Sequence, residues 1–343
     1  MPSILGLNYG ELEHLLASWQ ERIFHARQIF SWIYKKGITD FSLMSDIAST
    51  LRSKLKKEFS ILELRLIKVS ESRDKTKKFL FTLRDGEPIE AVIIPAENRI
   101  TACISSQVGC KYGCSFCASG VSGFKRNLDT AEIMQEVLFL NNYLRPKKLT
   151  HIVFMGTGEP LDNYDSVLKA IRIINSPQGL NIGARRITIS TSGIIPGIER
   201  LSREGLQIEL SVSLHSAVEK VRSRMMPVNR IFPLPELLDA CLEYIQRTNR
   251  QITFEYVLIK NLNAHPDAAE ALVKLLKPLK LAKVNLIPAN QVKELGIEPP
   301  NKLETLHFKG YLVKHGLHST LRKSRGDDID AACGQLRLNY VRQ

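Results

Sequence analysis

The feature of this sequence that most limits its fold is a long alternation of short apolar segments with helical patterns. Seven segments have the length and the β-branched content of strands: 100–106, 150–156, 186–192, 208–215, 252–259, 283–288 and 318–323. Amphipathic helical patterns lie between them: 130–143, 164–175, 234–248 and 266–276. Strands that alternate with helices form parallel βαβ units, because a parallel neighbour needs a long crossover connection. About six such units predict a full or partial (β/α) barrel.

A doubly wound sheet is the alternative for such an alternation, but no glycine fingerprint follows the first strand. The predicted fold is therefore α/β, with a partial (β/α)6 barrel of the TIM type in residues 99–343. Residues 1–60 have helical spacing and predict a small helical accessory domain that binds RNA. Residues 61–98 contain two β-rich runs around Asp85 and Gly86, the pattern of a β-hairpin between the two domains.

The balance of charged residues restricts the partners. Lys and Arg total 48 against 35 Asp and Glu, a formal net charge of +13, which favours a polyanion because phosphate contacts release counterions. Nucleic acid is therefore the expected substrate, and a merely basic enzyme is the alternative. Basic residues near the predicted mouth of the barrel are expected to contact RNA phosphates or a cofactor: Lys125, Arg126, Arg222, Arg224 and Arg230.

Hydropathy and cysteine content indicate the compartment. No apolar run approaches the length of a membrane-spanning helix, and the N-terminus lacks the apolar stretch of a secretory signal. The protein is therefore expected to be cytoplasmic, without a membrane partner. Six cysteines among 343 residues are too sparse for a disulfide scaffold, so metal binding or catalysis is their expected use. Cys241 is interpreted as a core residue of the helix at 234–248.

Three cysteines form a C-x3-C-x2-C run at Cys110, Cys114 and Cys117, directly after the first barrel strand. Loops in this position hold the active site of a barrel, and thiolates bind zinc or iron–sulfur clusters. A structural zinc site needs four ligands, usually as two pairs, and only one C-x2-C pair is present, although Cys103 in the strand is a possible fourth. A 4Fe–4S cluster held by three cysteines keeps one iron open to another ligand.

The run, with Phe116 before its last cysteine, resembles the signature of the radical S-adenosylmethionine superfamily. The resemblance implies a 4Fe–4S cluster on Cys110, Cys114 and Cys117, whose fourth iron chelates the amino and carboxylate groups of S-adenosylmethionine. An electron from the cluster then cleaves this cofactor to a 5′-deoxyadenosyl radical.

Further residues at the carboxyl ends of the predicted strands fit the same cofactor. They are Gly158, Glu159, Ser190, Ser213, Leu214, His215 and Asn290. By the resemblance, Gly158 and Glu159 of "MGTGEP" hold the amino group of S-adenosylmethionine. The others suit hydrogen bonds to its ribose and adenine. Each alone is more often a strand-end cap or turn, and their common placement favours cofactor binding.

A narrower resemblance covers nearly the whole chain. It rests on "HARQIFSWIYKKGITDF", "IEAVIIP", "CISSQVGCKYGCSFCASG", "GFKRNL", "MGTGEP", "STSGIIP", "SLHS", "RSRMMPVNR", "KVNLIPAN" and "RGDDIDAACGQL". These segments are similar to the RNA adenine methyl synthases, above all to those that act on both 23S rRNA and tRNA. The resemblance implies methylation of C2 of an adenosine in the peptidyl transferase centre of 23S rRNA and of the adenosine 3′ to the anticodon in tRNAs. The segment after Asn290, "QVKELGIEPPNK", departs from the family pattern in one active-site loop.

The resemblance also implies a mechanism. C2 of adenine is electron-poor and cannot attack a sulfonium methyl group, so a carbon radical must add to it. In this family Cys333 receives a methyl group from one S-adenosylmethionine, and a second is cleaved at the cluster. Hydrogen abstraction from the methyl gives a radical that joins enzyme and RNA covalently. Glu90 is implied as the acceptor of the C2 proton, and Cys103 as the thiolate that attacks Cys333, frees the RNA and leaves a disulfide.

The implied partners are 23S rRNA, tRNA and an electron donor such as flavodoxin or ferredoxin, and a monomer is the expected state. Two alternatives stay open at this point. One is the same mechanism directed to C8 of the rRNA adenosine, as in a resistance-conferring branch of the family. The other, of a different class, is a non-enzymatic RNA-binding protein that holds zinc.

Overall fold

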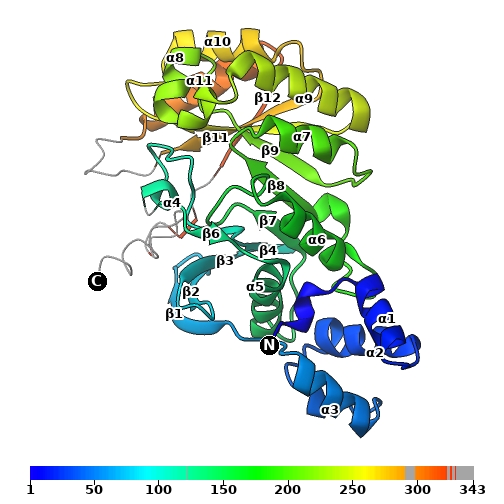
Figure 1. Cartoon of the computed structure of the whole chain (residues 1–343). Coiled ribbons are helices and arrows are strands. Elements are labelled where there is room, and N and C mark those ends of the chain that lie inside the picture. Colours follow the sequence, from blue (N-terminus) through cyan, green and yellow to red (C-terminus); the bar gives the residue numbers. More distant parts are fainter. Residues whose placement is uncertain (122, 290–297, 323–324, 327–328, 330–343) are drawn as a thin grey trace.

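One ten-stranded sheet organises the molecule (Figure 1). The structure is a computed structural model, and it describes residues 1–121, 123–289, 298–322, 325–326 and 329. The strand order is β1-β2-β3-β4-β7-β8-β9-β10-β11-β12. No helix in the described part combines the length and apolar character that crossing a membrane requires.

Seven of these strands run parallel and form the predicted partial barrel. They are β4 (Arg99–Cys103), β7 (His151–Phe154), β8 (Ile187–Thr191), β9 (Glu209–Ser213), β10 (Ile252–Leu258), β11 (Ala282–Pro288) and β12 (His318–Leu321). Each lies within a segment predicted from the sequence, or extends one by a single residue, because β-branched runs mark buried strands. Among the described residues β12 pairs only with β11, so the barrel is open, as the prediction of a partial barrel requires.

Three antiparallel strands extend the barrel sheet on one side. They are β1 (Arg65–Glu71), β2 (Lys77–Thr82) and β3 (Pro88–Ala96). The turn between β2 and β3 places Gly86 at φ 88°, a left-handed conformation that favours glycine, so the predicted hairpin is confirmed. Because β3 also pairs with β4, the hairpin is continuous with the barrel. The domain limits at residues 60 and 98 stay a prediction.

Helices cover the outer face of the parallel strands. They are α5 (Thr130–Tyr143), α6 (Tyr164–Asn175), α7 (Ile195–Ser202), α8 (Glu219–Met225), α9 (Leu234–Thr248), α10 (Pro266–Leu276) and α11 (Lys302–Lys314), with 3-10 turns η4 (Ala184–Arg186) and η5 (Pro227–Arg230). The bounds of α5, α6, α9 and α10 are those that the helical periodicity predicts. A capping box of Asp129 and Glu132 starts α5, and prolines stand in the first turns of α9 and α10.

The N-terminal region is helical, as predicted, and it packs beside α5 (Figure 1). Its elements are η1 (Ile4–Gly6), α1 (Tyr9–Ser18), α2 (Phe24–Phe30), the π-turn η2 (Ser31–Lys35), η3 (Phe41–Leu43) and α3 (Ser49–Glu58). The Asn142 side chain of α5 donates to the Gly37 carbonyl at 2.9 Å, and Gly6 lies against Ala131. These contacts hold the region against the barrel.

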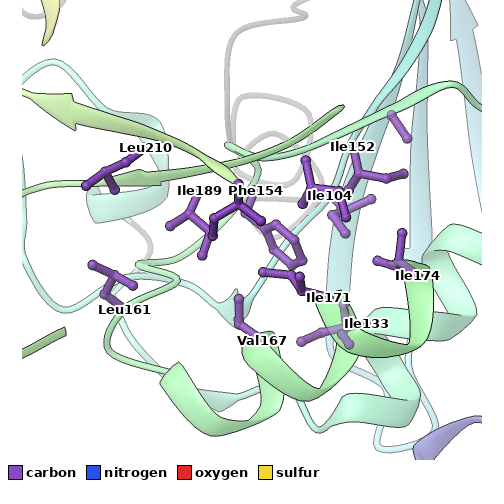
Figure 2. Close-up of a cluster of buried hydrophobic side chains, with 14 of the residues drawn as sticks. Ile104, Ile133, Ile152, Phe154, Leu161, Val167, Ile171, Ile174, Ile189 and Leu210 are labelled. Carbon is purple, nitrogen blue, oxygen red and sulfur yellow. The ribbon is translucent and has the colours of Figure 1, made fainter. Parts of the chain in front are cut away.

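The two faces of the parallel sheet differ in polarity. Figure 2 shows the outer face, where Ile152, Phe154 and Ile189 of the strands meet Val167 and Ile171 of α6. At alternate positions the seven parallel strands carry polar side chains on the inner face. They are Thr101, Cys103, His151, Thr188, Ser190, Ser211, Ser213, Thr253, Glu255, Asn285 and Thr320. The inner face is therefore suited to a polar ligand.

Phe154 lies at the centre of the packing between the sheet and α6, and only 1% of it is exposed. We expect Phe154→Ala to lower the free energy of unfolding by about 3–5 kcal/mol, because the cavity adds to the lost burial. Leu306 on α11 is 47% exposed, so Leu306→Ala should change it by less than about 0.5 kcal/mol. Urea denaturation followed by circular dichroism tests both, and equal effects would contradict this packing.

Candidate active site

The cysteine run forms a closed loop at the carboxyl end of the first parallel strand. Cys110, Cys114 and Cys117 are half-buried between β5 (Gln107–Val108) and α4 (Ala118–Val121). β5 pairs with β6 (Arg126–Asn127), so the two ends of the loop are joined. Gly109 has φ +80°, and a Cβ there would lie 1.7 Å from the Gly123 carbonyl oxygen, so this closure requires glycine.

Side chains of the loop converge on Asp162. Lys111 Nζ lies 2.6 Å from one carboxylate oxygen, and Tyr112 donates to the same oxygen at 3.2 Å. Gln107 Nε2 donates to the other oxygen at 2.9 Å. A second anchor joins the Ser115 amide to the Met225 carbonyl of α8 at 2.9 Å. The loop is therefore fixed both to the segment after β7 and to α8.

The electrostatics of the loop fit a cationic group bound by thiolates. Burial, together with the nearby charges of Glu159 and Cys117, raises the pKa of Cys110 to about 12, although a backbone hydrogen bond with Tyr112 acts in the opposite direction. Burial also raises the pKa of Cys114, with contributions from Cys117 and Cys110. The protein alone thus disfavours the thiolates, and bound metal reverses this by releasing their protons. Within the described residues no three His, Cys, Asp or Glu side chains already meet in a metal-binding geometry.

An unsatisfied hydroxyl also lies beside the last cysteine of the loop. Ser119 is buried in α4, and its Oγ has no hydrogen-bond partner among the described residues. A buried polar atom without a partner costs free energy, so a bound group that accepts from it would remove the cost. Three soft donors and this hydroxyl make the loop compatible with an iron–sulfur cluster and its cofactor.

The glycine loop after β7 packs tightly against β5. Gly158 has φ +108°, and a Cβ there would lie 2.5 Å from Gln107 Cβ, so a larger residue does not fit. Glu159 is buried, and its amide donates to Gln107 Oε1 at 2.8 Å. Its carboxylate accepts from the Ser192 amide at 2.6 Å, which joins the ends of β7 and β8. Burial raises the pKa of Glu159, and its charge acts on the cysteine loop.

Ser190 and Ser213 lie half-buried on the inner face, at the ends of β8 and β9. Leu214 follows, but its side chain is fully buried in the core, so it offers the site only its backbone. The structure therefore brings these predicted residues to the same end of the sheet as Gly158 and Glu159. Asn290 lies outside the described residues, so its role stays a prediction.

His215 lies in the loop that follows β9. It has φ 56°, an uncommon conformation for this residue, and its Nδ1 accepts from the Val257 amide at 3.0 Å. Burial, and then the charge of Arg222, lowers the pKa of His215 to about 3, so the ring is neutral. The ring packs edge-on against Phe116 with centroids 4.6 Å apart. His215 therefore links the end of β9 to the cysteine loop.

Cys103 and Glu90 lie on the inner face where the hairpin joins the barrel. Cys103 ends β4 and pairs with Val92 of β3, and Glu90 lies two residues from Val92 on the same face. Glu90 is not solvated as a hairpin carboxylate would be. It is buried, and its Oε2 lies 3.1 Å from Nζ of Lys78, a residue that the sequence analysis did not single out. Cys333 lies outside the described residues, so the expected approach of the two sulfurs remains a prediction.

The sequence predicts that Arg222 contacts RNA phosphates or a cofactor, and its burial contradicts the contact with RNA. Arg222 is completely buried, and its guanidinium donates to the carbonyls of Ser192 at 2.8 Å and Ser213 at 3.2 Å and to Asn229. It therefore ties together the carboxyl ends of β8 and β9. Of the other basic residues, Lys125, Arg224 and Arg230 are exposed and Arg126 is paired with Asp85 and Glu132. Cys241 is a core residue, as predicted.

The fold and the cysteine loop define the class of protein. Residues 104–273 match the family model of the radical SAM superfamily, and residues 3–61 match that of the ribosomal RNA large subunit methyltransferase N-terminal domain. The crystal structure of a radical SAM methyltransferase from Sphaerobacter thermophilus is similar over 98% of this chain and 99% of that chain, with a TM-score of 0.94 and 41% identity. The chain is therefore a radical SAM enzyme.

Full-length relatives specify the family. The chain is 44% identical to the "Probable dual-specificity RNA methyltransferase RlmN" of Geobacillus kaustophilus, over 98% of this chain and 93% of the relative. It is 45% identical to the protein of the same name from Dictyoglomus turgidum, over 100% and 98%. The chain belongs to the RlmN family. The predictions of a radical SAM fold and a methyltransferase are thereby confirmed, and a non-enzymatic zinc protein is excluded.

Asp162 has the most contacts with the cysteine loop of any carboxylate described above, although no motif marks it in the sequence. We expect Asp162→Ala to lose its iron–sulfur cluster to a chelator about ten times faster than the wild type. The reason is that Lys111, Tyr112 and Gln107 lose their shared contact with the carboxylate. Iron and sulfide per chain, measured after anaerobic reconstitution and a chelator challenge, give the result. The matched control is Asp165→Ala, whose side chain is 86% exposed and pairs with Arg200 at the surface. Equal iron loss in both variants would contradict the anchoring role.

Proposed function

We propose that this enzyme methylates C2 of a specific adenosine in the peptidyl transferase centre of 23S rRNA and of the adenosine 3′ to the anticodon in tRNAs. The observation that carries the proposal is the identity of 44–45% to relatives named dual-specificity RNA methyltransferases, over nearly the whole chain. The net charge of +13 supports an RNA substrate, because basic surfaces attract phosphates. The N-terminal match to a ribosomal RNA methyltransferase domain supports RNA binding by residues 1–60.

The site residues take the following roles in the proposal. Cys110, Cys114 and Cys117 hold a 4Fe–4S cluster, and a second set binds S-adenosylmethionine at its open iron: Gly158, Glu159, Ser190, Ser213, Leu214, His215 and Asn290. When bound, the cluster and cofactor supply a 5′-deoxyadenosyl radical, which a base carbon that is not nucleophilic requires. The closed loop with its half-buried cysteines supports this assignment, because it limits the access of water to a reactive species.

The chain's own nucleophiles and base complete the proposal. Cys333 carries the methyl group and becomes joined to the RNA through it. Glu90 accepts the C2 proton, and the thiolate of Cys103 attacks the sulfur of Cys333, which releases the RNA and forms a disulfide. Two molecules of S-adenosylmethionine are used in each turnover. The shared inner face of Glu90 and Cys103 supports two consecutive steps at one substrate position.

The remaining parts of the proposal concern the partners. A reduced flavodoxin or ferredoxin supplies electrons, and the enzyme acts as a monomer in the cytoplasm. The described inner face is polar, as binding of a nucleotide and a cofactor there requires. Base-modifying enzymes take the target base out of its stack, so the adenosine enters this face unpaired.

Nucleoside analysis decides the position of the new methyl group. We expect anaerobic incubation of the reconstituted enzyme with 23S rRNA and tRNA to yield 2-methyladenosine, detected by mass spectrometry, because a radical carbon adds at C2. Omission of the reductant is the control and should abolish the product. A product that is only 8-methyladenosine would show that the enzyme acts at C8 instead.

Replacement of the resolving thiol tests the covalent mechanism. We expect Cys103→Ala to accumulate a protein–RNA adduct that survives a denaturing gel, because nothing attacks the sulfur of Cys333. Cys241→Ala is the matched control, since Cys241 is buried in α9 away from these steps. Normal turnover by Cys103→Ala would remove Cys103 from the mechanism.

A further inference from the structure

Lys78 and Glu90 form a buried ion pair on the inner face of the hairpin extension. Lys78 Nζ lies 3.1 Å from Glu90 Oε2, and the two side chains are 0% and 4% exposed. Burial of both charges has a desolvation cost that their attraction barely offsets, and apolar residues of similar volume are often as stable. A buried ion pair is therefore weak evidence for a purely stabilising role.

The strand register places this pair in the proposed active site. Lys78 of β2 is opposite Val92 of β3, and Val92 is opposite Cys103 of β4, so the three form one cross-strand row. Because side chains alternate between faces, Glu90 shares the face of this row. The opposite face of β2 is occupied by Phe79 and Phe81, whose rings pack against Phe139 and Tyr143 of α5.

Other charged groups border the same face. Lys68 of β1 is opposite Leu80 and is exposed, and Arg99 of β4 is exposed. His151 of β7 is opposite Thr101, and burial, together with the charges of Arg99 and Arg186, lowers its pKa. Lys78 is distinguished from these groups by being fully buried and in direct contact with the carboxylate of Glu90.

We propose that Lys78 is a positioning residue that holds the Glu90 side chain on the face that carries Cys103, ready to accept the C2 proton of the RNA adduct. The inference rests on the proposed function. In this step the proton moves from C2 to a Glu90 oxygen, and the electron pair of the C–H bond stays on the base.

Removal of Lys78 is expected to slow resolution of the adduct and to leave the earlier steps unchanged. Removing Lys78 takes away the ammonium that lies 3.1 Å from the Glu90 carboxylate, and with it a contact that fixes this carboxylate on the inner face. Methylation of Cys333 and cleavage of the cofactor precede this step and do not use Lys78. The expected defect is therefore an adduct that forms and is not resolved.

The experiment compares three variants of the full-length, reconstituted enzyme on a 23S rRNA fragment that the wild type methylates. In Lys78→Met, we expect resolution of the covalent adduct to be about tenfold or more slower than in the wild type, because the Glu90 carboxylate loses its positioning contact. Lys78→Arg keeps the charge and should restore the rate. The matched control is Lys77→Met, which removes the same charge from the other face of β2, where Lys77 pairs with Glu71 at 3.2 Å.

Two further measurements keep the outcome unambiguous. Methyl-Cys333 and 5′-deoxyadenosine should form at wild-type rates in Lys78→Met, which separates its defect from loss of the cluster. If Lys78→Met does not fold, Lys78→Gln replaces it, because it removes the charge and keeps a polar side chain at the buried position, and it should show the same slow resolution.

The results that would overturn the inference are distinct from failure of the proposed function. Resolution at the wild-type rate in Lys78→Met or in Lys78→Gln would remove Lys78 from the proton step. A rate that Lys78→Arg does not restore, or equally slow formation of methyl-Cys333 and 5′-deoxyadenosine in Lys78→Met, would reduce Lys78 to a structural role. A wild-type enzyme that forms neither adduct nor 2-methyladenosine would instead overturn the proposed function, and the role of Lys78 with it.

Discussion

The site depends on the close packing of two backbone segments, the end of the first parallel strand and the glycine loop of the second. The Ser106 and Gln107 amides both donate to the Thr157 carbonyl, at 2.9 and 3.1 Å, and the Gly156 amide donates to Ile104. A Cβ on Gly156 would lie 2.6 Å from the Ile104 carbonyl oxygen. Only glycine permits this approach, and the approach brings the cysteine loop beside Glu159.

From this contact the site extends across the strand ends through buried polar groups. Glu159 joins the loop after β7 to Ser192, and Arg222 joins Ser192 to Ser213 at the end of β9. His215 then returns to the cysteine loop through Phe116. Because Glu159, Arg222 and His215 are buried and hydrogen-bonded, the geometry around a bound cofactor is set before the cofactor arrives.

The antiparallel extension adds a buried ion pair to the inner face. Pairing of β3 with β4 continues this face beyond Cys103 and places Glu90 and Lys78 there. In the proposed function the barrel end supplies the cluster and cofactor residues, and the extension supplies the proton acceptor. The hairpin can take part in such a site because it shares a sheet with the barrel strands.

The sequence by itself determined the local features. Strand and helix periods gave the bounds of α5, α6, α9 and α10, because burial on one face imposes a repeat that adjacent residues carry. Cysteine spacing indicated the proposed cluster, because the three cysteines lie within one loop. Only the tertiary structure decided the partners of isolated charges: Lys78 with Glu90, Asp162 with Lys111, and Arg222 with strand-end carbonyls rather than RNA. These contacts form between segments that are distant in the sequence and that the strand register and the crossover connections bring together. No pattern of neighbouring residues encodes them.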